Sequence, residues 1–353
     1  MLRLDTVPCP QTGEYRRTGH QKLHRTVRLS GMCTRFLWSS MGEPGKGNVL
    51  VGRSMDWYQD TQTNLAVRPR GVERQSIPSD PDDRGGFSWT SEYGSVVALM
   101  YGQAVVDGVN EKGLQACGLY LSESDYGIRD QNRKGLELYS AIQCLLDRFD
   151  TVAAAVTWIV DSDVQLIEMS LGEKPGTGHI ALADLSGDSA IVEFLDGKAS
   201  VHHGPEYTVM ANSPVYAEQL ELVKEYPPYN DNNTLPGGTE SPERFARAVY
   251  YSTMLPPTEE TREATAYAFS VIRNASAPFG TVDVIRPNIS TTRWRTVTDL
   301  TERRYFFEST TSPNVVWIEL DQLNFDTLNE ERQLDLVNEP DRVGDVTEEF
   351  TAV

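Results

Sequence analysis

The placement of strand-like segments constrains the fold of this chain more than any other sequence feature. Short runs rich in β-branched and aromatic residues occur near the start, at 33–38 and 48–53, and return near the end, at 294–298 and 304–308. Between these ends, residues 136–149 repeat apolar side chains at helical spacing. Strand-rich ends around a helical middle predict an α+β fold built from packed layers.

The same patterns predict further elements. Strands are expected at 87–101, 115–121, 179–185, 190–194, 199–203, 207–210 and 315–319. Helices are expected at 215–226, 241–254 and 259–272, and another that runs to residue 159 with Thr151 as its N-cap. The sequence DGVNEKG at 107–113 is typical of a hairpin turn, because it lacks the residue spacing of a calcium or phosphate loop.

The chain divides into three parts by composition. Residues 1–32 show neither helical nor strand periodicity, and we interpret them as a non-structural leader. Residues 33–325 form the predicted domain, since no internal repeat or long linker interrupts them. Residues 326–353 are polar and acidic and are expected to form a partly ordered C-terminal tail.

Three explanations of residues 1–32 compete. The segment carries a formal charge of +4, which leaves −23 on residues 33–353. It is a propeptide, a basic targeting arm, or translated upstream sequence with Met32 as the real start. We favour the third, because a small residue such as Cys33 after Met32 permits ordinary removal of the methionine. The targeting arm lacks the amphipathic pattern that such arms show.

Charge and composition exclude several classes of function. A formal net charge of −19 argues against a nucleic-acid partner. No apolar run is long enough to span a bilayer and no secretion signal is present, so we expect a cytoplasmic protein without a membrane partner. The four cysteines show neither CxxC nor Cys/His metal spacing, so neither a metal nor another cofactor is expected.

Seven groups of short motifs follow one another between residues 32 and 325. They are MCTR at 32–35, GRSMDW at 52–57, DGVNEKGL at 107–114 with GLY at 118–120, MANSP at 210–214, LPGG at 235–238 with ERF at 243–245, RNASAPFG at 273–280, and TRWRTVTDL at 292–300. In this order they resemble the choloylglycine hydrolase/penicillin V acylase family of linear amide hydrolases. The resemblance implies the N-terminal-nucleophile (Ntn) fold, a four-layer αββα sandwich of two packed, mainly antiparallel sheets.

The resemblance makes Cys33 the nucleophile, although a single cysteine is more often an inert core residue. A free α-amine has a pKa of about 7.7–8.0 and a thiol of about 8.5, so an amine on Cys33 itself can take the thiol proton without a histidine. By resemblance, Arg53 supplies a cation that favours the thiolate, and Asp56 orients the amine. Their spacing of three on a strand-to-loop turn is expected to aim both side chains at the start of the first strand. Taken alone, Arg53 and Asp56 would be a local surface ion pair.

Three more site residues come from the resemblance. Asn212 would donate its side-chain amide to the oxyanion, and Tyr120 would donate its backbone N–H. Arg244 would hold the Asn/Asp network, although Arg247 lies on a neighbouring helical position. Without the resemblance, Asn212 is a turn residue before a proline, Tyr120 a strand aromatic and Arg244 a solvated charge.

The resemblance implies a small-molecule N-acyl amide substrate. Tyr120 stands where penicillin V-preferring members carry Tyr and bile-salt-preferring members carry Asn, which favours a penicillin V acylase-like or N-acyl homoserine lactone acylase-like activity over a bile salt hydrolase. By position, Trp57, Tyr58 and Trp89 are pocket aromatics, with core packing as the alternative. Relatives often form homotetramers, so a homo-oligomer is expected.

Two other classes of function stay open at this point. The fold can persist with a dead site, which would leave a catalytically inactive ligand-binding protein. A cysteine hydrolase could instead use a histidine as its base, with His179, His202 or His203 in that role.

Overall fold

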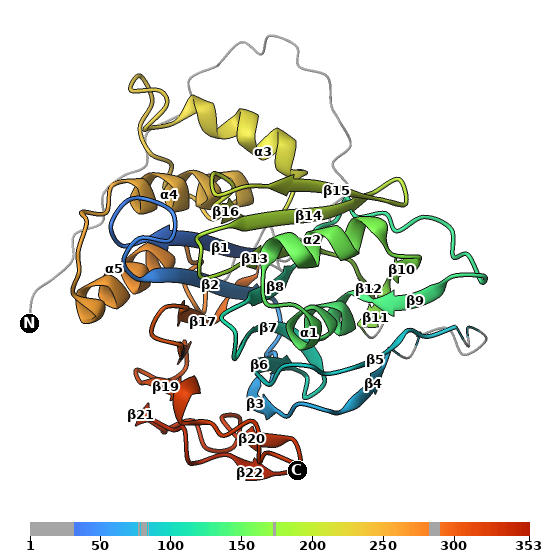
Figure 1. The fold of residues 1–353 in the computed structure, drawn as a ribbon. Coiled ribbons are helices and arrows are strands. Elements are labelled where there is room, and N and C mark those ends of the chain that lie inside the picture. The colour runs from blue at the N-terminus through green and yellow to red at the C-terminus, as the bar shows by residue number, and fades with distance from the viewer. Residues whose placement is uncertain (1–31, 77, 79–82, 84, 172–173, 282–289) are drawn as a thin grey trace, which may run out of the picture.

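Two large sheets packed face to face organise the protein, and helices cover their outer faces (Figure 1). The computed structural model describes residues 32–353 except 77, 79–82, 84, 172–173 and 282–289. The arrangement confirms the predicted α+β sandwich of two mainly antiparallel sheets.

The first sheet contains both the N-terminal strands and the late strands of the chain. Within the described residues it has seven strands in the order β16-β1-β2-β17-β18-β19-β21, antiparallel except for the last pair. The bounds are β1 Met32–Ser39, β2 Val49–Trp57, β16 Val209–Met210, β17 Thr291–Asp299, β18 Arg304–Ser309, β19 Val315–Glu319 and β21 Gly344–Asp345.

The second sheet is antiparallel throughout and, over the same described residues, has nine strands in the order β15-β14-β13-β8-β7-β6-β3-β20-β22. The bounds are β3 Asn64–Arg68, β6 Ser95–Met100, β7 Ala104–Asn110, β8 Gln115–Leu119, β13 His179–Ala183, β14 Ser189–Leu195, β15 Lys198–His203, β20 Arg332–Leu334 and β22 Thr351–Ala352. Three small pairs lie outside the large sheets: β4 Glu73–Gln75 with β5 Ser88–Thr90, β9 Lys134–Glu137 with β10 Val164–Ile167, and β11 Met169–Leu171 with β12 Lys174–Gly176.

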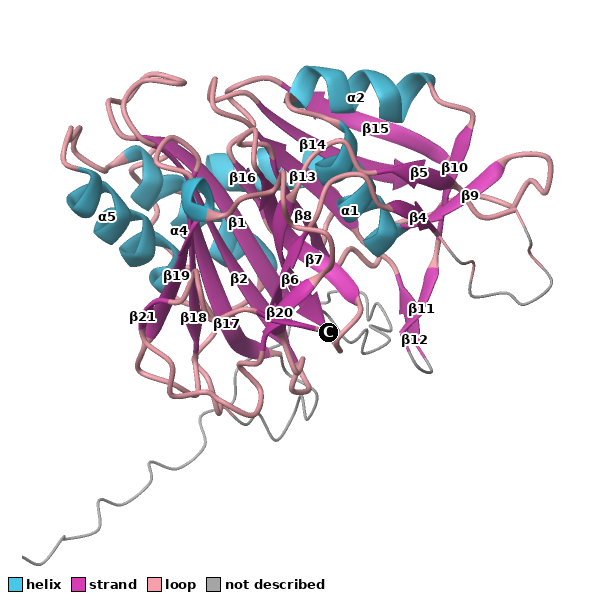
Figure 2. Cartoon of the chain, turned by 60° about the horizontal axis from the view of Figure 1, so that its bottom comes forward, coloured by secondary structure: helices cyan, strands magenta, loops and turns pink. Residues whose placement is uncertain are grey.

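Helices form the two outer layers. The bounds are α1 Leu138–Arg148, α2 Val152–Asp161, α3 Tyr216–Leu222, α4 Ser241–Thr253 and α5 Thr261–Asn274, with short 3-10 turns η1 Val223–Glu225 and η2 Leu320–Gln322. Helices α4 and α5 pack on β1, β2 and β17, whereas α1 packs on β7 and β8 on the opposite side of the sandwich (Figures 1 and 2). In the part of the chain that is described, no helix combines the length and the apolar character needed to cross a membrane.

Local sequence explains where two of the helices begin. The Thr151 hydroxyl accepts a hydrogen bond from the Ala154 N–H at 3.4 Å, which confirms the predicted N-cap of α2. Helix α4 begins with a capping box between Glu240 and Glu243, and a proline stands in its first turn. Because α4 packs on β1, this start fixes which of its side chains face the strands.

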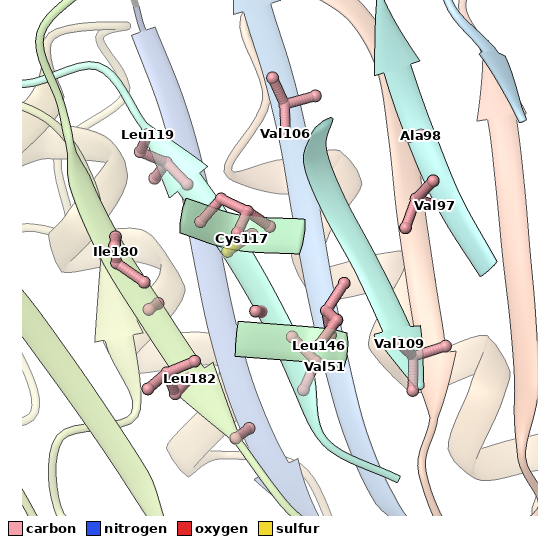
Figure 3. Packing of buried hydrophobic residues seen from close by; sticks show 14 of the residues in the cluster. Val51, Val97, Ala98, Val106, Val109, Cys117, Leu119, Leu146, Ile180 and Leu182 are labelled. Atoms are coloured by element: carbon pink, nitrogen blue, oxygen red, sulfur yellow. The ribbon is translucent and has the colours of Figure 1, made fainter. Parts of the chain in front are cut away.

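Apolar side chains fill the space between the sheets (Figure 3). Val51 of β2 in the first sheet and Cys117 of β8 in the second are both buried, and Figure 3 shows them in one cluster with Leu146 of α1. On the other face of β2, Gly52 lies against the ring of Phe36: a Cβ at Gly52 would stand 2.2 Å from Phe36 Cε1. The Phe36 ring therefore occupies the space that a side chain at position 52 would need.

Three segments differ from their sequence predictions. The segment 87–101 contains two strands, β5 and β6, because the Glu92 and Tyr93 amides bind the carbonyl of Asp147 instead of a neighbouring strand. Asp107 to Asn110 belong to strand β7, so the predicted hairpin turn covers only residues 111–114. The C-terminal segment 326–353, expected as a partly ordered tail, adds β20 and β22 to the second sheet and β21 to the first.

Replacing Gly52 by alanine tests the contact with Phe36. We expect Gly52→Ala to lower the free energy of unfolding by about 1–3 kcal/mol, because the Phe36 ring must move out of a packed layer. Urea denaturation measures the change. Gly237→Ala is the matched control, since no atom lies within 4 Å of its added Cβ; equal stability of the two variants would contradict the prediction.

Candidate active site

Cys33, the expected nucleophile, lies near the start of β1 and is 2% exposed. In this structure Met32 precedes it, so the Cys33 nitrogen is a peptide nitrogen that stands where a free α-amine would be. Its N–H donates to Asn212 Oδ1. The Cys33 Sγ lies 3.8 Å from Met55 Sδ and 3.9 Å from the Asp56 carbonyl oxygen, so the sulfur faces the adjacent strand β2.

The two expected partners of Cys33, Arg53 and Asp56, lie on strand β2 and point to opposite faces of the first sheet. The strand continues through Trp57, so Arg53 and Asp56 lie within it and not on a strand-to-loop turn as predicted. A spacing of three in a strand points side chains to opposite faces. Accordingly, Arg53 reaches the second sheet, where its Nη2 donates to the Gly118 carbonyl at 3.1 Å, whereas Asp56 lies on the side of α4.

Arg53 is fully buried between the sheets. Its guanidinium carbon lies 4.5 Å from the centre of the Trp294 ring, and its charge interacts with Cys33 and Asp107. Burial opposes this charge, but the attraction of Cys33 and Asp107 keeps the pKa of Arg53 above its usual value. The surface ion pair considered as an alternative is therefore excluded by the burial of Arg53.

Asp107 is a buried carboxylate that the sequence analysis assigned to a turn. It accepts hydrogen bonds from Gln115 Nε2 at 2.8 Å, from Thr296 Oγ1 at 2.9 Å and from the Tyr305 hydroxyl at 2.7 Å. Burial raises its pKa, and the charge of Arg53 opposes that rise. The only sequence signal that could have predicted this structural role of Asp107 is its position at the start of the DGVNEKGL motif.

Asp56 has one carboxylate oxygen with a hydrogen-bond donor and one, Oδ2, without such a donor among the described residues. Its Oδ1 accepts from Thr292 Oγ1 at 2.6 Å, and Arg244 Nη1 lies 3.7 Å from Oδ2. Among the described residues, Asp56 Oδ2 has no hydrogen-bond donor although it is buried. Burial raises the pKa of Asp56, with Arg244 and Thr292 acting against the rise.

Arg244 connects Cys33 to Asn212. Its Nη1 donates to the Cys33 carbonyl and to Thr34 Oγ1, both at 2.5 Å, and its Nη2 donates to Asn212 Oδ1 at 2.8 Å. The competing Arg247 instead binds backbone carbonyls, among them that of Gly238 at 2.6 Å. The fold thus resolves which arginine of α4 faces the site.

Asn212 and Tyr120 come from different sheets and meet beside Cys33. Asn212 stands two residues after β16 in the first sheet, and Tyr120 directly follows β8 in the second. The Asn212 Nδ2 donates to the Tyr120 carbonyl at 2.7 Å. An amide nitrogen carries two hydrogens, so this bond leaves one hydrogen of Nδ2 for a ligand.

Two of the three expected pocket aromatics lie with Tyr120. The Trp57 ring is 5.3 Å from the Tyr58 ring and 6.0 Å from the Tyr120 ring, measured between centroids. Trp89 lies elsewhere: its Nε1 donates to Asp147 of α1 at 2.7 Å and its ring stacks on Phe87. The structure therefore brings Trp57 and Tyr58 to the site and leaves Trp89 with the outer helices.

The three candidate histidines have other partners. His179 Nε2 donates to the Ala211 carbonyl at 2.8 Å, and its Nδ1 lies 3.4 Å from Glu193 Oε1. His203 pairs with Asp188, and His202 packs on tyrosine rings. Within the described residues no hydrogen bond joins a histidine to Cys33, and no group of His, Cys, Asp and Glu side chains could hold a metal ion.

Comparisons with known proteins identify the family of this chain. Residues 33–332 match the model of the linear amide C–N hydrolases, choloylglycine hydrolase family. The chain belongs to this family. It is therefore a hydrolase that acts on the C–N bond of amides.

Relatives with sequence and structural similarity include penicillin V acylases. The chain is 40% identical to a penicillin V acylase of Pectobacterium atrosepticum over 84% of its own length and 83% of the relative. It superposes on a penicillin V acylase of Agrobacterium tumefaciens with a TM-score of 0.82 at 40% identity, covering 91% of this chain and 98% of the other.

A bile acid hydrolase variant of Clostridium perfringens shares the fold at 18% identity, with a TM-score of 0.69 over 86% of this amide hydrolase and 97% of the other chain. The bile salt hydrolase/transferase of that organism is 20% identical over 62% of the present chain and 74% of the relative.

Removing the charge of Arg53 should make the Cys33 thiolate harder to form. Burial already raises the pKa of Cys33, and Arg53 is the strongest influence that lowers it. In Arg53→Met, the pH at which iodoacetamide alkylates Cys33 at half its maximal rate should rise by about 1–3 units. Arg53→Lys keeps the charge and should shift less. An unchanged alkylation profile in a folded Arg53→Met protein would contradict the role of this charge.

Proposed function

We propose that this chain hydrolyses a small N-acyl amide by attack of Cys33, and that the working enzyme begins at Cys33. The observation that carries the proposal is that Asn212 and Arg244 bind the backbone nitrogen and carbonyl of Cys33, while Asp56 lies 3.7 Å from the same arginine. Backbone groups of a strand normally pair with neighbouring strands, so buried side chains that bind them at a strand start point to a role other than strand pairing. The family match, which begins at residue 33, gives further support.

The chemistry needs a free amine on Cys33. A peptide nitrogen has no basic lone pair, whereas an α-amine with a pKa of about 7.7–8.0 can accept the thiol proton near neutral pH. The sulfur then bonds to the carbonyl carbon, and the departing amine receives the proton as the C–N bond breaks. Water next cleaves the thioester and regenerates the thiol. Asp56 Oδ2, buried and without a donor, is suited to hold the protonated amine.

The oxyanion formed during attack needs fixed donors. We assign this role to the remaining Nδ2 hydrogen of Asn212 and to the backbone N–H of Tyr120. Arg244 holds Asn212 Oδ1, which turns the amide nitrogen away from the arginine and towards the site. Arg244 thus orients the asparagine, and Arg53 favours the thiolate from the space between the sheets.

A penicillin V acylase-like or N-acyl homoserine lactone acylase-like activity fits the site best. Identity of 40% to penicillin V acylases, the tyrosine at position 120 and its packing on Trp57 support an apolar or aromatic acyl group. Conjugated bile salts are the alternative, but the similarity to bile salt hydrolases is lower. A catalytically inactive ligand-binding protein is the competing class.

The remaining expectations belong to the same proposal. We infer that residues 1–32 are absent from the working enzyme and that 33–325 hold the complete site. The enzyme acts in the cytoplasm as a homo-oligomer, with a tetramer as the expected form. It needs no cofactor, because its own sulfur and amine supply the nucleophile and the base.

The N-terminus provides the first test. A preparation that begins at Cys33, verified by intact mass, should hydrolyse penicillin V, with a higher kcat/KM than for a glycine-conjugated bile salt. The chain with residues 1–32 still attached should be inactive, as should Cys33→Ser. Equal turnover with the leader attached would rule out the amine as the base, and inactivity of the verified preparation on a panel of acyl amides would favour the binding-protein class.

Loss of the proposed oxyanion donor provides the second test. Asn212→Ala should lower kcat by roughly 10²–10³-fold, as for a lost oxyanion donor. Asp56→Asn should also lower turnover by orders of magnitude, because the amine loses its charged partner. Steady-state kinetics on penicillin V measure both, and near-normal rates in both variants would show that these roles are wrong.

A further inference from the structure

A cluster of three polar side chains lies beside the two proposed oxyanion donors. Ser213 Oγ donates to Glu123 Oε2 at 2.6 Å, and Ser122 Oγ donates to the same oxygen at 2.9 Å. The two hydroxyl oxygens are themselves 2.9 Å apart. All three residues are half-buried. One carboxylate oxygen of Glu123 thus accepts hydrogen bonds from two hydroxyls at the edge of the site.

The cluster joins the segments that carry the donors. Ser213 is the residue next to Asn212, and Ser122 lies two residues after Tyr120. These segments follow strands of different sheets and are 90 residues apart or more along the chain. The bond from Asn212 Nδ2 to the Tyr120 carbonyl also joins the two segments. The serine–glutamate cluster is thus a second connection across the same gap.

A second connection matters because oxyanion donors act only when their spacing is fixed before the reaction. Donors about 2.7–3.1 Å from the developing oxyanion stabilise it, and a misplacement of about 1 Å can cost about 10²-fold in rate. Both donors lie just beyond strand ends, where the sheet ladder no longer holds the backbone. If Asn212 alone joined the two segments, its side-chain amide would have to hold Tyr120 and bind the oxyanion at the same time.

We propose that Glu123, Ser122 and Ser213 form a clamp that holds the Tyr120 and Asn212 donors at the spacing needed for catalysis. The inference rests on the proposed function, since it assumes that these two residues bind the oxyanion. The clamp residues are positioning residues: their contacts go to one another and not to the sulfur. They act by keeping two loops from different sheets in one arrangement.

The chain offers a matched control on the same loop. Ser124 Oγ donates to the Gly178 carbonyl at 2.8 Å, which ties the loop to the segment before β13 and not to Asn212. Ser124→Ala therefore removes one hydrogen bond of similar length without touching the clamp. Glu123→Gln is the conservative variant, because an amide oxygen can still accept a hydroxyl hydrogen.

The experiment compares Glu123→Ala, Ser213→Ala and Glu123→Gln with Ser124→Ala, all in the enzyme that begins at Cys33. Three quantities are measured: kcat and KM on penicillin V, the affinity for phenoxyacetaldehyde, and the rate of alkylation by iodoacetamide. Thiol addition to the aldehyde forms an S–C bond and turns the carbonyl oxygen into an alkoxide or hydroxyl, which needs the oxyanion donors. Alkylation needs only the thiolate.

We expect kcat of Glu123→Ala and Ser213→Ala to fall about tenfold, a smaller loss than removal of a donor itself. Aldehyde affinity should fall in parallel, while KM and the alkylation rate should change less than twofold. Glu123→Gln should recover part of kcat, and Ser124→Ala should match the unmodified enzyme.

The clamp and the proposed function fail in different ways. If Glu123→Ala and Ser213→Ala retain the kcat and aldehyde affinity of Ser124→Ala, the clamp is wrong and the proposed function stands. A parallel loss of alkylation rate also overturns the clamp, because the effect then acts on the thiol. Unchanged kcat and aldehyde affinity in Asn212→Ala would overturn the proposed function and the clamp with it.

Discussion

The buried charges between the two sheets are the interaction on which the rest of the structure depends. Arg35 and Arg53 lie opposite each other on β1 and β2, and each donates to a carbonyl of the second sheet, at 3.0 Å and 3.1 Å. Asp107 reaches in the other direction, to hydroxyls of β17 and β18. Because a buried charge without partners is costly, these contacts fix how the sheets face each other.

The site depends on that registration, because its parts come from both sheets and from a helix. Cys33 and Arg53 belong to the first sheet, Tyr120 follows a strand of the second, and Arg244 comes from α4 on the outer face. A shift of one sheet over the other would move Tyr120 away from Asn212 without breaking a strand. The buried arginines and Asp107, which fix how the two sheets pack, therefore also fix the positions of the site residues.

Local sequence predicted much of the fold and less of the site. Alternation and helical spacing located β1, α4 and the cap at Thr151, because these features need only neighbouring residues. Asp107 resembled a turn residue, since its partners Thr296 and Tyr305 lie almost 200 residues away. The choice between two arginines of α4 depended on how the helix is rotated against β1. The sequence did not predict the short strands β3 and β20, because they pair with each other across more than 260 residues.

The position of β20 has a consequence for the synthesis of this protein. Residues 332–334 complete the pairing of β3, which is made from residues 64–68. During translation β3 can bind β6 on one side, but its other edge stays open until residues 332–334, more than 260 positions later, have left the ribosome. Open strand edges attract other chains. The nascent enzyme therefore carries an open strand edge from the time β3 emerges until residues 332–334 pair with it.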